Sequence, residues 1–275
     1  MSAVATASKK QRLDLVLLER GLAASRQAAQ GLIMAGRVRV DGRVAAKAGE
    51  RVGIDATIDV SGALHPFVGR GGVKLAGALE AFGLEVAGLA ALDVGSSTGG
   101  FTDCLLQRGA SRVFAVDVGH NQLDWRLRQD PRVVVHEGIN ARYLTAGDLP
   151  ELETGADLAV MDLSFISLRL VLPAVAALLR PGGPPHAWIA ALVKPQFEAG
   201  RADTPKGVVR DPAVRRRVLR DVCAAAAGWG SQVLGVVDSG LPGPKGNREF
   251  LVHLTDSREP TDPDELDRWI DDAVG

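Results

Sequence analysis

The chain has 275 residues, is 46% hydrophobic and carries 32 Lys and Arg against 33 Asp and Glu. This length and composition predict a folded protein with one large core and room for a small extra domain. No stretch approaches the ~20 apolar residues that span a bilayer, and no signal-peptide pattern follows the first lysines, so we expect a cytoplasmic protein without a membrane segment. The two cysteines, Cys104 and Cys223, exclude a disulfide framework and lack the spacing of a zinc site, so no metal is expected.

The first sixty residues are basic, with ten Lys and Arg against six Asp and Glu. Apolar residues at helical spacing predict two short helices between residues 12 and 36. The segment VRVDG at 38–42 then predicts a short strand and a tight hairpin turn. We therefore expect a small α+β domain over residues 1–60. Its excess positive charge suits a polyanion such as RNA, and a solvated basic surface is the alternative.

This N-terminal segment resembles the RNA-binding domain first named from ribosomal protein S-four. The resemblance rests on Arg12-Leu13-Asp14, Ser25-Arg26, Leu32-Ile33, Gly36 and VRVDG. It implies that Arg12, Arg26 and Arg37 follow an RNA backbone, and Arg39 of the basic hairpin joins them as an RNA-binding candidate. The alternative is that these arginines only face solvent, with Arg26 in the first turn of a helix and Arg39 on the exposed face of a strand.

A second domain is expected over residues 67–275, after a linker at 61–66 with the sequence SGALHP. Apolar runs at 89–94, 113–120, 133–142, 158–168 and 187–198 alternate with helical patterns, and VLGVVDSG and FLVHL add two further strands. This alternation predicts an α/β fold with a doubly wound, mainly parallel, Rossmann-like sheet, whose site lies at the carboxyl ends of the strands.

A glycine-rich loop follows the first of these strands. The strand ends near Asp93, and Gly95, Gly99 and Gly100 allow the backbone to approach a ligand closely before the next helix begins. The loop lacks the GxGxxG spacing that holds the pyrophosphate of a dinucleotide. S-adenosylmethionine has no pyrophosphate, and its sulfonium cation suits nearby carboxylates. An ordinary glycine turn in an α/β fold is the alternative.

Two further residues are candidates for the same cofactor. Asp117 ends the second strand, at the interval where nucleotide-binding folds place an acid that binds the ribose hydroxyls. Asn140, or the backbone near Gly138, follows the third strand and is expected to face the adenine.

Four separated polar residues carry the predicted chemistry: Lys74, Asp162, Lys194 and Glu249. Three of them lie at the edges of apolar strands, where a charge needs a partner or a function. Together with the cofactor loop, they indicate transfer of the cofactor's methyl group to a ribose 2'-hydroxyl of RNA. Because this hydroxyl is a poor nucleophile, the enzyme must align it with the methyl group and supply an acceptor for its proton. Lys194 is the candidate base, and Asp162 and Glu249 would orient the two ammonium groups. A structural ion pair is the alternative for Lys194 and Asp162, and a solvated surface position is the alternative for Lys74.

The large domain resembles the heat-shock ribose methyltransferases of the FtsJ (RrmJ) family, which carry a Lys, Asp, Lys, Glu tetrad in this order. Together with the N-terminal domain it resembles the TlyA family of ribosomal RNA cytidine 2'-O-methyltransferases, also labelled haemolysin A. The matching segments are DVGSSTGGFTD, VDVG, DLSFISL, LVKPQFE, GVVRDP and NREF, whereas HPFVG in the linker departs from the more basic pattern expected there. The resemblance implies that the tetrad is catalytic and that the cofactor is bound by Asp93, Gly95, Ser96, Thr98, Gly99, Gly100 and Asp117.

The predicted function is S-adenosylmethionine-dependent 2'-O-ribose methylation of ribosomal RNA at cytidine, with ribosomal RNA or ribosomal subunits as partners. One alternative is a non-catalytic RNA-binding or ribosome-assembly factor that retains a cofactor fold. The other is a pore-forming haemolysin, which the absence of spanning or strongly amphipathic segments disfavours.

Overall fold

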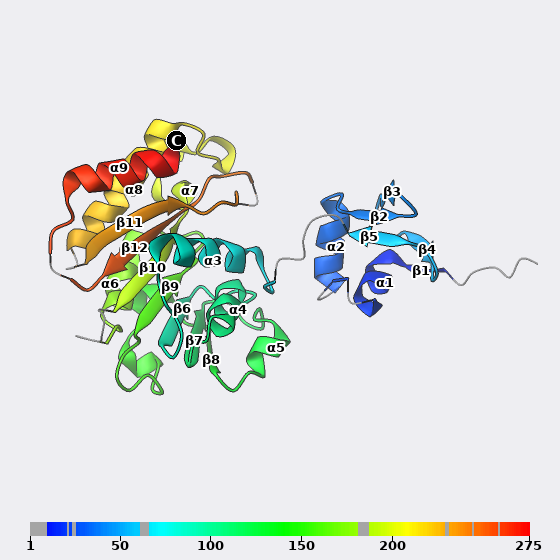
Figure 1. Ribbon diagram of the computed structural model, residues 1–275, viewed down its shortest axis with the longest axis horizontal. Coiled ribbons are helices and arrows are strands. Elements are labelled where there is room, and N and C mark those ends of the chain that lie inside the picture. Colours follow the sequence, from blue (N-terminus) through cyan, green and yellow to red (C-terminus); the bar gives the residue numbers. More distant parts are fainter. Residues whose placement is uncertain are drawn as a thin grey trace, which may run out of the picture. The chain divides into compact units, whose positions relative to one another are not determined.

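A computed structural model describes residues 10–20, 22–23, 26–60, 66–180, 187–228, 231–243, 245–257 and 259–275. It divides the chain into two compact units, residues 1–64 and 65–275 (Figure 1). The expected domains at 1–60 and 67–275 lie close to this division. All of the expected linker except Pro66 lies outside the described residues.

The first unit contains the two expected helices, α1 (Leu13–Glu19) and α2 (Arg26–Met34), and the expected hairpin of β2 (Val38–Val40) and β3 (Arg43–Val44). Asp41 and Gly42 make its turn with φ of 50° and 80°. Three strands were not expected: β1 (Lys10–Arg12) and β4 (Arg51–Gly53), which pair together, and β5 (Ile58–Val60), which pairs with β2. Strands of three residues are too short to give a readable alternation of apolar and polar positions.

The second unit is built on a seven-stranded sheet with the order β11-β12-β10-β9-β6-β7-β8. Its strands are β6 (Ala90–Val94), β7 (Arg112–Asp117), β8 (Val133–Glu137), β9 (Leu158–Met161), β10 (Trp188–Val193), β11 (Gln232–Asp238) and β12 (Phe250–Thr255). Only β12 runs antiparallel to its neighbours β10 and β11. The predicted doubly wound, mainly parallel α/β fold is therefore confirmed.

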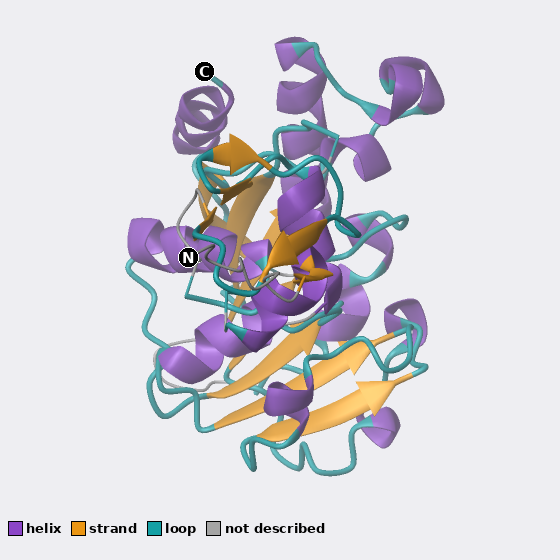
Figure 2. Ribbon diagram, turned by 90° about the vertical axis from the view of Figure 1, so that its right-hand side faces the viewer, coloured by secondary structure: helices purple, strands orange, loops and turns teal. Residues whose placement is uncertain are grey.

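Helices cover both faces of this sheet (Figures 1 and 2). They are α3 (Arg70–Phe82), α4 (Gly100–Gln107), α5 (Trp125–Arg128), α6 (Leu172–Ala176), α7 (Pro195–Glu198), α8 (Pro212–Gly228) and α9 (Pro263–Val274), with short 3-10 turns at Ala141–Tyr143, Ala146–Asp148, Leu168–Leu170, Arg201–Asp203 and Pro205–Gly207. Side chains of α3, α4 and α5 form one apolar core with the sheet, and side chains of α6, α8 and α9 form the other. Central strands such as β9 are buried on both faces, which explains their continuous apolar sequence.

Two element boundaries affect the site. The strands end earlier than the apolar runs suggested, so β9 ends at Met161 and leaves Asp162 in the following loop. Helix α3 begins at Arg70 and includes Gly71 and Gly72, so Lys74 lies in its second turn. A methyl group on Gly72 would lie 2.4 Å from Phe67 Cγ and 2.7 Å from the Gly100 carbonyl oxygen, so close packing requires glycine inside this helix.

Candidate active site

Lys74 and Glu249 form a buried ion pair between α3 and the start of β12. The Lys74 ammonium contacts Glu249 Oε2, and the two side chains are only 8% and 1% exposed. Gly243 packs directly against the Glu249 carboxylate, because a methyl group there would lie 2.2 Å from Oε1. Lys74 is therefore not the solvated surface lysine that its helix alone would suggest.

Asp162 and Lys194 form the second pair, at the carboxyl ends of the neighbouring parallel strands β9 and β10. Lys194 Nζ lies 2.6 Å from Asp162 Oδ1 and donates a hydrogen bond of 3.0 Å to Ser164 Oγ. These side chains are more open than the first pair, with Lys194 at 13% and Asp162 at 26% exposure. The ammonium group therefore lies between two oxygens, and both side chains of the pair keep part of their surface exposed.

The first turn of α3 brings Asp162 next to the helix that carries Lys74. A methyl group on Gly71 would lie 3.5 Å from Asp162 Oδ2, and Lys74 follows one helical turn later on the same face. Arg70 also donates to the Pro242 carbonyl, which ties this end of α3 to the loop that precedes Glu249. The four predicted catalytic residues therefore converge as two ion pairs at one edge of the sheet.

The glycine loop between β6 and α4 lies beside these pairs. Gly95 and Gly99 have φ of 87° and 96°, which disfavours any other residue. A methyl group on Gly95 would lie 2.6 Å from the Asp162 carbonyl oxygen, so the loop and the end of β9 touch directly. Methyl groups on Gly99 and Gly100 would meet Leu127 and the backbone of α3, so tight packing accounts for glycine at these two positions.

Asp93 lies within β6 and is completely buried. Thr102 Oγ1 donates to its Oδ2 at 2.6 Å, while its Oδ1 has no hydrogen-bond partner among the described residues. Burial, followed by the negative charges of Asp162 and Asp117, raises the pKa of Asp93 to about 7. An unpaired buried carboxylate oxygen is costly, and such groups concentrate at functional sites.

Asp117 is held by backbone amides at the carboxyl end of β7. Its two oxygens accept hydrogen bonds from the Ser97 and Gly119 N–H groups at 2.8 and 2.7 Å. Asn140 is exposed, and its side-chain oxygen accepts from the Arg142 N–H at 3.1 Å. Both side chains have further acceptor capacity for a ligand.

A pocket of about 500 Å³ lies between these groups. Four predicted residues line it: Gly95, Asp117, Asn140 and Asp162. Ser96, Thr98, Gly99, Gly100, Asp93, Lys74, Lys194 and Glu249 do not line it. The residues that the sequence reasoning missed are Ser97, Val116, Val118, Gln122, Ile139, Ala141, Leu163, Ser164, Phe165, Ile166 and Val171. The DLSFISL segment at residues 162–168 is the sequence signal for several of them.

Phe165 is the most unusual of the missed residues. Its side chain is 91% exposed, and its φ of 66° is a left-handed conformation that is rare for a bulky residue. Its ring packs against Phe197 with centroids 5.1 Å apart. The loop thus presents an aromatic face at the mouth of the pocket.

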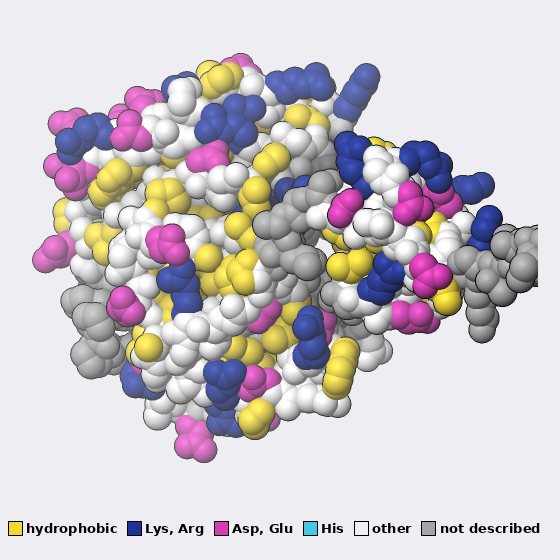
Figure 3. All heavy atoms as spheres, turned by 45° about the vertical axis from the view of Figure 1, so that its right-hand side comes forward, with side chains coloured by type: hydrophobic (Ala, Val, Ile, Leu, Met, Phe, Trp, Pro, Cys, Tyr) yellow, Lys and Arg dark blue, Asp and Glu magenta, His cyan; other side chains and the backbone are white. Residues whose placement is uncertain are grey.

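In the first unit, two of the four RNA-binding candidates share one anchor. Arg12 and Arg26 each lie 2.9 Å from Oδ2 of Asp14, which is fully buried, and the hydrogen bonds from Arg12 keep the pKa of Asp14 well below its usual value. Arg39 donates to the Gly42 carbonyl at 3.1 Å, and Arg37 is exposed. Figure 3 shows Lys and Arg side chains on the visible face of this unit, interspersed with acidic residues.

Comparison with known proteins places both units in families. The FtsJ-like methyltransferase family matches residues 67–256, and the S4 domain family matches residues 11–58. The chain belongs to the FtsJ-like methyltransferase family. Both resemblances stated from the sequence are confirmed, and with them the expectation of an enzyme that uses S-adenosylmethionine.

Several relatives align with nearly the whole chain. The 16S/23S rRNA (cytidine-2'-O)-methyltransferase TlyA of Mycobacterium tuberculosis is 47% identical over 270 residues, covering 97% of each protein. YqxC of Bacillus subtilis, named as a candidate rRNA methyltransferase, is 48% identical over 90% of this chain and 86% of its own length. A solved structure from Streptococcus thermophilus, titled as a candidate haemolysin, is 40% identical with a TM-score of 0.75 and covers 97% of this chain and 96% of its own.

Proposed function

We propose that this chain transfers a methyl group from S-adenosylmethionine to the 2'-hydroxyl of a cytidine in ribosomal RNA. The observation that carries the proposal is the convergence of Lys74–Glu249 and Asp162–Lys194 beside the glycine loop and its pocket. The named activity of the TlyA relative supports cytidine and ribosomal RNA as the substrate. Such a substrate also implies a cytoplasmic location.

The residues around the pocket fit S-adenosylmethionine. The bound cofactor supplies a methyl group on a positively charged sulfur, which is already activated for transfer. Asp117 and Asn140 line the pocket with acceptors for ribose hydroxyls and adenine, whereas Asp93, with its unpaired oxygen, is completely buried and supports the site from outside the pocket lining. We assign Ser96, Thr98, Gly99 and Gly100 to the support of this site, since they shape the loop without lining the pocket.

Lys194 accepts the proton from the ribose hydroxyl in this proposal. Asp162 and Ser164 hold its Nζ in one position, from which it accepts the proton after the ammonium group has released its own. Holding the hydroxyl and the methyl group in line contributes roughly 7–11 kcal/mol, and a positioned base contributes a further ~10²–10⁴-fold. Lys74 and Glu249 hold α3 and the β12 loop around this centre.

The RNA is bound by both units. Arg12 and Arg26, which both pair with Asp14, contact RNA phosphates. Arg37 and Arg39 contact further phosphates from the hairpin that follows. Phe165 offers its exposed ring to a base at the mouth of the pocket, because unstacked RNA bases are bound on aromatic faces. We retain 1–60, 61–66 and 67–275 as the RNA-binding domain, linker and catalytic domain.

The alternatives have weaker support. A non-catalytic RNA-binding factor has no use for two ion pairs that converge beside a cofactor pocket. For a pore-forming haemolysin, no helix within the described ranges combines the length and apolar character needed to cross a membrane.

The direct test is transfer of a labelled methyl group to purified ribosomal subunits, with the methylated riboses mapped by their resistance to alkaline cleavage. Lys194→Ala and Lys194→Arg should both abolish single-turnover transfer, since guanidinium stays protonated at any working pH, while cofactor affinity stays within a few-fold. Lys206→Arg, on an exposed lysine of the same unit, is the matched control and should be fully active. A near-normal rate for Lys194→Arg would exclude the base role, and no transfer by the unmodified protein would exclude the activity.

A further inference from the structure

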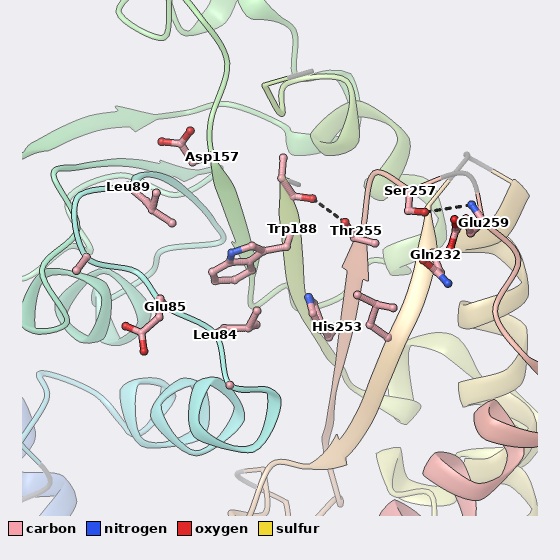
Figure 4. A pocket seen from close by; sticks show the side chains of 14 residues that line it. Leu84, Glu85, Leu89, Asp157, Trp188, Gln232, His253, Thr255, Ser257 and Glu259 are labelled. Atoms are coloured by element: carbon pink, nitrogen blue, oxygen red, sulfur yellow. Dashed lines mark hydrogen bonds between the residues drawn. The ribbon is translucent and has the colours of Figure 1, made fainter. Parts of the chain in front are cut away.

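A second pocket of about 630 Å³ lies at the opposite edge of the sheet from the candidate active site. Trp188 begins β10 and His253 lies near the end of antiparallel β12, so both stand at the amino edge of the parallel strands. Figure 4 shows their rings beside Leu84, with Leu89 across the pocket and Glu85 and Glu259 also lining it. The volume is in the range of small-molecule sites.

The pocket exists because α3 stops before it covers this edge. The helix ends at Phe82, Gly83 follows in the left-handed conformation with φ of 64°, and residues 84–89 turn away toward β6. The Trp188 and His253 rings on this face are therefore packed at the sides but open at one end. Their exposures are 6% and 8%.

Both rings carry polar atoms that bond to no side chain or backbone group in the described ranges. The indole N–H of Trp188 and the imidazole of His253 make only ring contacts, 6.3 Å apart with each other and 5.4 Å from His253 to Phe82. Neither forms a hydrogen bond with a described residue, although each is more than nine-tenths buried. The fully buried side-chain atoms without a partner belong to other residues, so these ring nitrogens reach the open pocket and are available to a ligand.

The described charged residues that line the pocket are acidic: Glu85, Asp157 and Glu259. Glu85 and Glu259 are exposed and form no ion pair within the described part of the chain, whereas Asp157 is compensated by Arg180 at 3.0 Å. No Lys or Arg is among the described lining residues. Burial lowers the pKa of His253 to about 4, so the imidazole is neutral at physiological pH and does not oppose a cation.

We propose that this pocket binds a flat organic cation, an aromatic ring that carries an amidinium or ammonium group. The ring packs against Trp188 and Leu84, and its positive charge is attracted to the indole face and to Glu85 and Glu259. Its N–H groups donate to the neutral His253. The same carboxylates repel phosphates and carboxylates, which separates this site from the RNA-binding surface. The proposal is independent of the methyl-transfer activity.

Three probes of nearly equal size but different charge test the proposal: benzamidine, benzamide and benzoate. Binding is measured on the full chain by protein-observed NMR, with S-adenosylhomocysteine added to saturate the active site, because S-adenosylmethionine is itself a heteroaromatic cation. Benzamidine should bind at least tenfold more tightly than benzamide, benzoate should not bind, and the shifted resonances should include the Trp188 indole N–H. Equal binding of all three probes, or no binding of benzamidine at tens of millimolar, would overturn the proposal.

Variants then test the assigned contacts. The double substitution Glu85→Gln and Glu259→Gln removes two exposed charges without disturbing the core, and should reduce benzamidine affinity at least fivefold while leaving benzamide unchanged. Trp188→Phe keeps an aromatic ring and removes the N–H donor, so it should weaken benzamide, whose carbonyl accepts from that N–H, more than benzamidine, which has no acceptor for it. Asp264→Asn, on an exposed residue of α9, is the control and should change nothing. Unaltered benzamidine affinity in the double variant would show that these carboxylates do not form the site.

Discussion

Removal of the Glu249 carboxylate should be far more destabilising than removal of an exposed one. Glu249→Ala leaves the Lys74 ammonium buried without its partner, which costs roughly 3–5 kcal/mol of unfolding free energy. For a domain of this size, each kcal/mol lowers Tm by about 2–4 °C, so a drop of about 6–20 °C is expected. Replacing both partners, as in Lys74→Met with Glu249→Leu, should recover most of the loss because no charge is left uncompensated.

The assay is thermal unfolding of the full chain followed by tryptophan fluorescence. The four tryptophans all belong to the second unit: Trp125, Trp188, Trp229 and Trp269. The fluorescence signal therefore reports unfolding of the unit that contains the Lys74–Glu249 pair. Asp267→Ala breaks the exposed pair with Arg220, whose side chains are 55% and 48% exposed, and should cost no more than about 1 kcal/mol. If Glu249→Ala and Asp267→Ala lower Tm equally, the burial argument for the first pair is wrong.

Three other outcomes are expected. Asp117→Ala should weaken S-adenosylmethionine binding by about 1.5–3 kcal/mol without unfolding the domain, and unchanged calorimetric affinity would place the ribose elsewhere. In the cofactor-free protein, folded Asp93 keeps its proton up to a pH of about 7 while the unfolded chain releases it near ~4, so this residue should lower stability as pH rises through that window, by up to ~1.4 kcal/mol per pH unit. Asp93→Asn should remove that slope from urea midpoints, and an unchanged slope would contradict the raised pKa. Arg26→Ala should weaken binding to RNAs of any sequence and reduce the slope of log affinity against log salt concentration by about one. An unchanged slope would place Arg26 away from the RNA.

The positions of Asp117, Asp162 and Lys194 were predictable because sheet geometry is simple. Each follows or ends an apolar run, and the carboxyl ends of parallel strands meet at one edge. The sequence could therefore place Asp162 and Lys194 together without showing their contact. Their pairing at 2.6 Å agrees with that reasoning.

The burial of Lys74 was not predictable, since its partner lies 175 residues later in the chain. Helix periodicity marks Leu75 and Leu79 as core but gives no information about a lysine that reaches a distant carboxylate. Phe165 was missed for a similar reason, because its left-handed backbone contradicts the propensity of a bulky residue. The second pocket depends on where α3 ends relative to the sheet, which no local pattern encodes.

The two ion pairs differ in a way that separates their roles. Asp162 and Ser164 line the pocket and Lys194 contacts both, whereas Lys74 and Glu249 are almost completely buried and line no part of it. A group that solvent barely reaches is better suited to hold α3 and the β12 loop than to exchange a proton with RNA. We therefore expect Lys74→Met with Glu249→Leu to keep measurable single-turnover methylation, while Lys194→Ala keeps none. If the stable double variant is as inactive as Lys194→Ala at every pH, all four residues take part in the transition state and the division into an acting pair and a supporting pair is wrong.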